Sequence, residues 1–342
     1  MNQPAARPAS NEPRLRSTRD EALDLVKGLL VVWMLVYHWL NYFTEAGDWV
    51  YRLLRPVTPS FIFIAGYLAV RLALAAGTGT TRATAVRLLA RGVRLLLLFT
   101  ALNLGLLLLE GRGVPLPQAL TDFVRQAPAL YLGTAGGGHF LVLVPIAYAM
   151  AVAPLFLWLL DGHQAWAFAA TAACIVFVAV AEHLGVPSGH LFLFSFGLLG
   201  LCAGTVNQSW LERSSAIPWA LVAAFACYLV AVFLWNVRFS VQIVGVPLTL
   251  LGLYAVGRRW RRDGTARRAV LLMGQYTLFA YLLQIAVLQL LKRLVFPAPL
   301  DVLWAVLPFA LALGGMLALT ALTREARRRA TSVDRLYRAV LS

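Results

Sequence analysis

The sequence predicts an all-α membrane protein, a polytopic bundle of about ten transmembrane helices with both termini in the cytoplasm. Hydrophobic residues make up 60% of the 342 residues, charged residues only 13%, and the mean hydropathy is +0.74. A soluble chain of this length could not bury so much apolar surface. Ten segments each have about 20 mostly apolar residues, which is the length that crosses the hydrocarbon core of a bilayer. They are roughly 24–43, 56–76, 88–109, 139–160, 164–183, 190–206, 217–235, 239–257, 270–292 and 301–323.

The basic residues predict the orientation of these segments. With the N-terminus inside, 22 arginines fall in cytoplasmic segments, against seven arginine and lysine residues in the outer ones. Membrane proteins carry this excess of positive charge on the cytoplasmic side, so both termini are expected there. The same placement explains the net charge of +15 without a nucleic-acid partner, because the basic residues gather at helix ends.

The domain organisation follows from composition. Residues 1–20 are rich in Pro, Ala, Asn and Arg and have no apolar core, which predicts a disordered cytoplasmic tail and not a signal peptide. Residues 21–323 are expected to form one transmembrane domain because the two halves share no repeat, and 324–342 a basic cytoplasmic tail. The link 110–138 is expected to be the longest loop, since it contains three prolines and three consecutive glycines.

A stripe of polar residues runs along the first predicted helix. Lys27 and His38 are eleven residues apart, which places them on one helix face about 16 Å apart along the axis. Asp24 is three residues before Lys27 and can pair with it. Titratable side chains are costly in hydrocarbon, so this stripe is a candidate functional site. His38 lies toward the outer side and is a candidate general base.

Most of the other histidines also lie at the outer depth. His139 opens the fourth segment, Glu182 and His183 close the fifth, and His190 opens the sixth. Taken singly, such histidines are often only interfacial polar groups. A zinc site built from Glu182, His183 and His190 has no known ligand spacing, so no metal is predicted.

Four arginines gather at the inner end of the third segment: Arg82, Arg87, Arg91 and Arg94. One interpretation is an orientation signal, and the other is a phosphate-binding patch, because arginine clusters suit phosphate groups. A nucleotide-bearing acyl carrier such as coenzyme A would use this patch as a transient donor, with no cofactor bound permanently. An inner anion site and an outer histidine suit acyl transfer from a cytoplasmic donor to an extracytoplasmic acceptor.

Several motifs resemble the membrane acyltransferases of acyltransferase family 3, including the glucan succinyltransferase-like and heparan-glucosaminide acetyltransferase-like groups. The opening Leu23-Asp24-x-x-Lys27-Gly28, followed by His38, resembles the family's first helix. Further resemblances are Pro59 to Tyr67, the arginines at 87, 91 and 94, His139 to Pro145 with Pro154-Leu, and Met273 to Gln284. Three positions differ from the usual pattern: Lys27 replaces Arg, Ala65 replaces Ser, and Gln284 replaces His.

The resemblance implies a ten- or eleven-span enzyme that moves an acyl group, acetyl or succinyl, from cytoplasmic acyl-CoA to an extracytoplasmic glycan or glycolipid. It implies a multi-pass protein of the bacterial cytoplasmic membrane. His38, Lys27 and Asp24 would be catalytic, and Arg82, Arg87, Arg91 and Arg94 would bind the donor. The acceptor side would be lined by Asn41, Tyr42, His139, His190, Tyr281 and Gln284.

Two other classes remain open from the sequence. A ten-span transporter or flippase for a small polar or anionic substrate would also need an intramembrane polar stripe. A structural or assembly subunit could use the same residues to hold helices together. The sequence leaves the oligomeric state open, a homodimer included.

Overall fold

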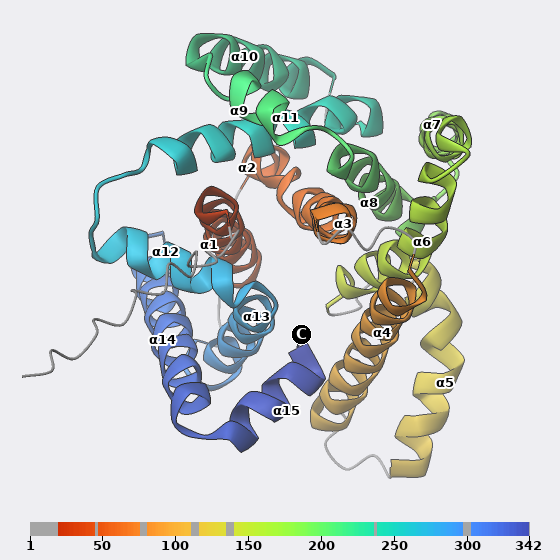
Figure 1. Cartoon of the computed structure of the whole chain (residues 1–342). Helices are drawn as coiled ribbons and strands as arrows, with labels where there is room; N and C mark the ends of the chain where they lie inside the picture. Colours follow the sequence, from red (N-terminus) through yellow and green to blue (C-terminus); the bar gives the residue numbers. More distant parts are fainter. Residues whose placement is uncertain are drawn as a thin grey trace, which may run out of the picture.

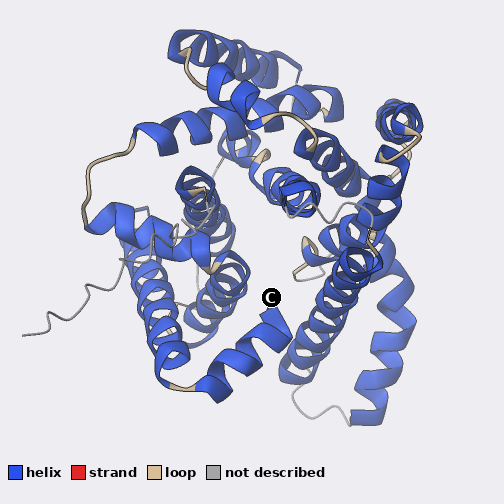
Figure 2. Ribbon diagram, in the orientation of Figure 1, coloured by secondary structure: helices blue, strands red, loops and turns tan. Residues whose placement is uncertain are grey.

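Helices account for all the regular secondary structure in the part of the chain that the structure describes (Figures 1 and 2). The computed structural model describes residues 20–44, 47–75, 81–110, 116–134, 140–235, 238–296 and 302–341. Its helices are α1 (Glu21–Phe43), α2 (Asp48–Leu54), α3 (Val57–Ala75), α4 (Arg82–Glu110), α5 (Leu116–Leu132), α6 (Leu143–Leu160), α7 (Gln164–His183), α8 (His190–Gly204), α9 (Gln208–Ser214), α10 (Pro218–Trp235), α11 (Phe239–Arg259), α12 (Thr265–Gln275), α13 (Thr277–Leu294), α14 (Val302–Arg329) and α15 (Thr331–Leu341).

The number of membrane spans agrees with the sequence prediction. Over the described residues, nine helices are long and apolar enough to cross a membrane, and a tenth is counted if α8 and α9 form one span. These two helices meet at an angle of 106°, and α8 alone has only 15 residues. Each of the ten predicted segments is helical, nine of them over a single helix, and the prediction of an all-α membrane bundle is confirmed.

The expected loop between the third and fourth spans is a helix over much of its length. α5 has 17 residues, of which Pro117 is the second and Pro128 lies in the last turns. Proline early in a helix removes no intrahelical hydrogen bond, so Pro117 is compatible with a helix start. The prediction of an unbroken loop was therefore wrong for 116–132.

Two C-terminal segments also differ from the expectation. The single span predicted over 270–292 consists of α12 and α13, which are separated at Tyr276 (φ −113°, ψ 34°). In the region predicted as a basic tail, α14 continues to Arg329 and α15 follows. The predicted disordered tail lies outside the described residues except for Asp20, and so does His139.

Helix α1 lies at the centre of one half of the bundle, where α3, α11, α12, α13 and α14 pack around it (Figure 1). Two glycines let α12 approach α1 to backbone contact. A Cβ added at Gly28 would lie 2.0 Å from the carbonyl oxygen of Val270, and one added at Gly274 would lie 1.8 Å from that of Asp24. Small residues commonly allow such approaches between membrane helices. The α12 backbone thereby braces the segment of α1 that carries Asp24 and Lys27.

Even the smallest enlargement of Gly274 should disturb this contact. We expect Gly274→Ala to destabilise the protein by about 1–3 kcal/mol, the usual cost of overpacking, because backbone atoms must move. Thermal unfolding in detergent micelles would measure this loss. Gly105→Ala is the matched control, because a Cβ at Gly105 meets no atom within 4 Å. Equal unfolding temperatures for the two variants would contradict the close α1–α12 contact.

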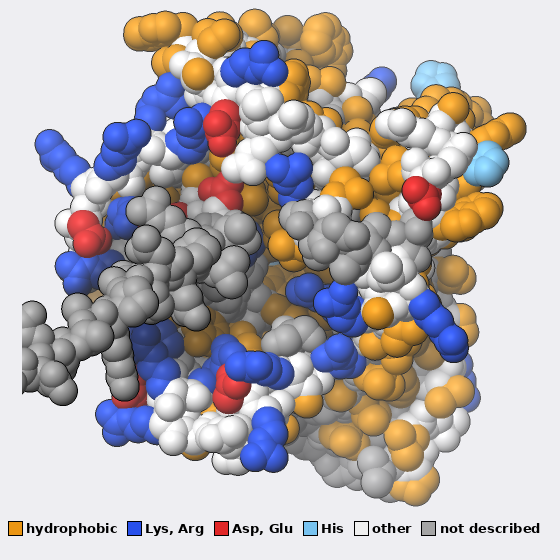
Figure 3. Space-filling model, in the orientation of Figure 1, with side chains coloured by type: hydrophobic (Ala, Val, Ile, Leu, Met, Phe, Trp, Pro, Cys, Tyr) orange, Lys and Arg blue, Asp and Glu red, His pale blue; other side chains and the backbone are white. Residues whose placement is uncertain are grey.

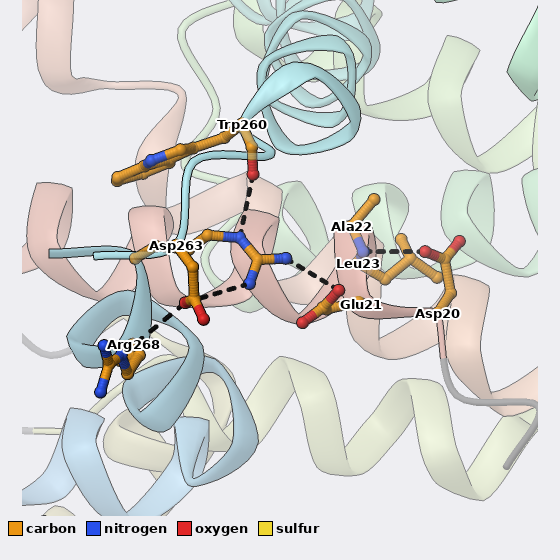
Figure 4. Close-up of polar contacts among 8 residues, drawn as sticks. Asp20, Glu21, Ala22, Leu23, Trp260, Asp263 and Arg268 are labelled. Carbon is orange, nitrogen blue, oxygen red and sulfur yellow. Dashed lines mark hydrogen bonds and ion pairs between the residues drawn. The ribbon is translucent and has the colours of Figure 1, made fainter. Parts of the chain in front are cut away.

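Polar contacts also fix α12 to the start of α1 (Figure 4). Arg267 forms an ion pair with Glu21 at 2.8 Å and donates from Nε to the carbonyl oxygen of Trp260 at 2.9 Å. Asp20 caps α1 by accepting from the backbone N–H of Ala22 at 2.9 Å. The beginning of α1 and the α11–α12 connection are therefore held at the same end of the bundle.

That end carries much of the positive charge. Figure 3 shows Lys and Arg side chains gathered on the face toward the viewer, over α4, α15 and the α11–α12 connection. The sequence prediction places this arginine-rich end on the cytoplasmic side.

Candidate active site

A cavity of about 550 Å³ opens among α1, α3, α4, α6, α12, α13 and α15. Its walls are mostly apolar, and its charged lining residues are Lys27, Arg87, Arg91 and Arg94. No acidic side chain occurs among the described residues that line it. Positive charges set in apolar walls focus an electrostatic field, so the cavity is suited to an anion.

Lys27 enters the cavity wall from α1 together with a buried carboxylate. Its Nζ lies 2.6 Å from Oδ1 of Asp24, and the side chains are 19% and 5% exposed, respectively. The predicted pair is confirmed. The short contact and the packed α12 backbone fix the position of the ammonium group at the wall.

Three of the four predicted arginines line the cavity from one face of α4. Arg87, Arg91 and Arg94 follow one another at intervals of four and three residues, which places them on the same side of the helix. Arg87 donates to Oγ1 of Thr84 at 3.2 Å. Arg91 has no hydrogen-bond or ion-pair partner among the described residues. Arg82 is exposed at the start of α4 and is not among the cavity residues.

Aromatic rings close the inner part of the cavity. Tyr281 lines it from α13 and is only 6% exposed. The ring centroids of Phe61 and Phe140 lie 6.2 Å and 6.5 Å from that of Tyr281. Phe140 has a φ of 57°, in the left-handed region that a phenylalanine rarely adopts. Of the described residues that were predicted to line the acceptor side, Tyr281 is the one that lies in the cavity wall.

His38 lies outside the cavity, in an aromatic cluster at the other end of α1. Its ring stacks on Tyr42, with centroids 6.3 Å apart, and meets the edge of Tyr37 at 5.3 Å. Tyr42 accepts from the side-chain amide of Gln289 at 3.4 Å. Neither His38 nor Tyr42 is among the residues that line the cavity.

Gln284 follows Tyr281 on α13 by one helical turn. It is fully buried, and neither its amide nitrogen nor its carbonyl oxygen has a hydrogen-bond partner within the described part of the chain. Buried polar groups are nearly always paired, and leaving one unpaired costs about 1–3 kcal/mol. An unpaired amide of this kind needs an explanation, and Gln284 is not among the residues that line the cavity.

The remaining predicted residues are not brought to the cavity. Asn41 is exposed near the end of α1. His190 is 4% exposed, and its Nε2 is 2.9 Å from the carbonyl oxygen of Leu130, so it joins α8 to the end of α5. His139 lies outside the described residues.

Sequence reasoning missed two cavity residues in the C-terminal segment. Tyr337 and Leu341 of α15 line the cavity. Val333, Leu336, Tyr337, Val340 and Leu341 recur at helical spacing, which is the signal of an amphipathic helix and could have indicated them.

The fold and the cavity define an integral membrane protein with a positively charged cavity at its arginine-rich end. Residues 20–323 match the acyltransferase domain of acyltransferase family 3, which is most of the chain. The chain belongs to this family and is a membrane acyltransferase. No curated protein and no solved structure matches it. The family does not favour the transporter or flippase alternative.

Proposed function

We propose that this membrane acyltransferase takes an acetyl or succinyl group from cytoplasmic acyl-CoA and passes it to a hydroxyl or amine of an extracytoplasmic glycan or glycolipid. The observation that carries the proposal is the cavity, which is lined by Lys27, Arg87, Arg91 and Arg94 and by no acidic residue among the described ones; Asp24 pairs with Lys27 from outside this lining. The protein would then reside in the bacterial cytoplasmic membrane.

The donor's phosphates suit the arginine side of the cavity. Guanidinium groups form paired hydrogen bonds with phosphate oxygens, and Arg91 has no partner among the described residues to compete for it. The apolar remainder of the wall suits the pantetheine arm. In this placement the thioester points toward Tyr281, which lies at the closed part of the cavity.

The acceptor would approach from the side of His38. The imidazole takes the proton of the acceptor hydroxyl, and the hydroxyl oxygen forms a bond to the thioester carbonyl carbon. The C–S bond then breaks, and the coenzyme A thiolate leaves and receives a proton. Gln284, with an unpaired buried amide, could hold an acceptor oxygen, while Tyr42 orients the His38 ring by stacking.

The decisive test is transfer of labelled acetyl or succinyl groups from acyl-CoA to envelope glycans by the purified protein in proteoliposomes. Mass spectrometry of glycans and lipids from a deletion strain should show the loss of the same acyl increment. Movement of a glycolipid across the vesicle membrane without consumption of acyl-CoA would contradict the proposal.

Removing one cavity arginine should weaken donor binding. We expect Arg91→Ala to reduce coenzyme A affinity about tenfold, because a charge-assisted hydrogen bond contributes about 1.5–3 kcal/mol. Isothermal titration in detergent measures this, and wild-type affinity should fall as salt rises. Arg82→Ala is the control, since Arg82 lies on the same helix but not in the cavity. An equal loss in both variants would indicate a general charge effect.

A further inference from the structure

The C-terminal helix α15 has a continuous apolar face. At 100° per residue, Val333, Leu336, Tyr337, Val340 and Leu341 fall on one side, and the charged residues fall on the other. The helix lies beyond residues 20–323, which match the family domain. It is therefore an addition to the enzyme core of this chain.

One edge of this face covers the cavity. Tyr337 and Leu341 line the cavity, and the Tyr337 ring packs 5.5 Å from Tyr276 and 6.3 Å from Phe279. The Arg327 guanidinium lies 3.9 Å from the centroid of the Tyr337 ring. In Figure 1, α15 runs from the end of α14 toward the middle of the bundle. The helix therefore forms part of the cavity wall at the arginine-rich end.

Polar contacts hold α15 in this seat. Asp334 pairs with Arg327 and with Arg338, each at 2.7 Å. Hydrogen bonds from Arg327, and to a lesser degree from Arg338, hold the pKa of the Asp334 carboxyl below its ordinary value. The carboxylate is therefore ionised at neutral pH, and so are the arginines that pair with it. Arg94 donates from Nη1 to the carbonyl oxygen of Arg338 at 3.2 Å. Arg94, one of the basic residues of the cavity wall, therefore contacts α15 directly.

The other edge of the apolar face is uncovered. Leu336 is 67% exposed and Val340 is 42% exposed. Exposed basic side chains lie on the other side of α15 and also occur at the end of α14: Arg324, Arg328, Arg329, Arg335 and Arg338. A helix with an exposed apolar edge and arginines on its polar side has the pattern of a helix that lies in the headgroup region of an anionic membrane.

We propose that α15 is an interfacial helix that docks its Leu336–Val340 edge on the anionic lipid surface of the cytoplasmic leaflet, and so holds its Tyr337–Leu341 edge over the cavity. The positive charge of this end of the chain complements that surface. Anionic lipid then controls entry to the cavity, because weaker docking releases the cover. The inference does not depend on which donor the cavity binds.

Lipid contact can be read from a fluorescent label on the full chain. Val340→Cys, in a background where Cys174, Cys202 and Cys227 are alanine, is labelled with an environment-sensitive dye and reconstituted. Its emission should shift to the blue when phosphatidylglycerol is added to phosphatidylcholine vesicles. Thr331→Cys, on the opposite side of α15 and exposed, is the control and should show no shift. A blue shift that grows with the number of protein molecules per vesicle, and not with the fraction of anionic lipid, would indicate that a second copy of the chain covers this edge. That result would overturn the proposal.

Cavity access tests the consequence without any acyl transfer. In the same cysteine-free background, Ala69→Cys places a thiol in the cavity wall, where maleimide can label it. Labelling should be at least about fivefold faster in neutral than in anionic vesicles. This factor corresponds to about 1 kcal/mol, the energy with which one arginine is attracted to an anionic membrane surface. The double variant Leu336→Ser with Val340→Ser removes the apolar edge and should be labelled at the fast rate in both kinds of vesicle. The double variant Leu336→Ile with Val340→Ile keeps the edge apolar and should keep the lipid dependence. Equal rates in all samples, with thermal unfolding unchanged, would overturn the proposal.

Discussion

Replacing His38 by alanine is expected to lower kcat for acyl transfer by about 10²–10⁴-fold, the range that a general base contributes. The expectation rests on the position of His38, which lies on the same face of α1 as Lys27 and in an aromatic cluster with Tyr37 and Tyr42. Turnover of labelled acyl-CoA by the reconstituted variant measures it. KM for the donor should change little, because His38 does not line the donor cavity.

The control for this experiment is His183→Ala. His183 is exposed at the end of α7 and is not among the residues that line the cavity. We expect this variant to keep wild-type turnover. A His38→Ala protein that folds normally and transfers acyl groups at the wild-type rate would remove His38 from the proposed mechanism, while leaving the donor cavity intact.

Replacing Lys27 by methionine is expected to destabilise the protein by about 3 kcal/mol, the lower end of the range for breaking a buried ion pair. The variant leaves the Asp24 carboxylate, 5% exposed, without its 2.6 Å partner. We take the lower end because Lys27 borders an open cavity. Thermal unfolding in micelles measures the loss, and coenzyme A affinity should fall in the same variant because a cavity charge is removed.

A double variant separates the two effects. Lys27→Met with Asp24→Asn removes both charges, so most of the stability should return while donor affinity stays low. If the double variant is as unstable as Lys27→Met alone, the ion pair is not the source of the stability. If donor affinity returns with stability, Lys27 acts on the fold and not on the donor.

The number and position of the membrane-spanning helices could be predicted from the sequence, because the thickness of the bilayer fixes the length of a crossing helix. A crossing helix needs about 20 apolar residues, and such runs can be counted directly. The polar stripe of α1 could be predicted for a related reason, since helical periodicity alone places Asp24 beside Lys27 and both on the face of His38. The α4 arginines follow the same logic at positions 87, 91 and 94.

Interruptions of a predicted span, and a helix outside the predicted spans, could not be found by counting apolar residues. The separation of α12 from α13 at Tyr276 occurs inside an apolar run, where no proline marks it. The close contact of α12 with α1 at Gly28 and Gly274 joins helices far apart in the sequence. The prolines made α5 hard to predict: Pro117 is compatible with a helix start, but Pro128 lies inside the helix and removes one of its backbone hydrogen bonds.

By itself, the sequence determined the helical membrane class, the paired Asp24 and Lys27, and the arginine face of α4, because each depends on spacing along one helix. Only the tertiary structure decided which of these residues share a space. It placed Lys27 and three arginines around one cavity, left His38 beyond Tyr281, engaged His190 with Leu130, and brought α15 over the opening. The physical reason is that a cavity is enclosed by several helices at once, and the packing of distant segments cannot be read from the periodicity of any one of them.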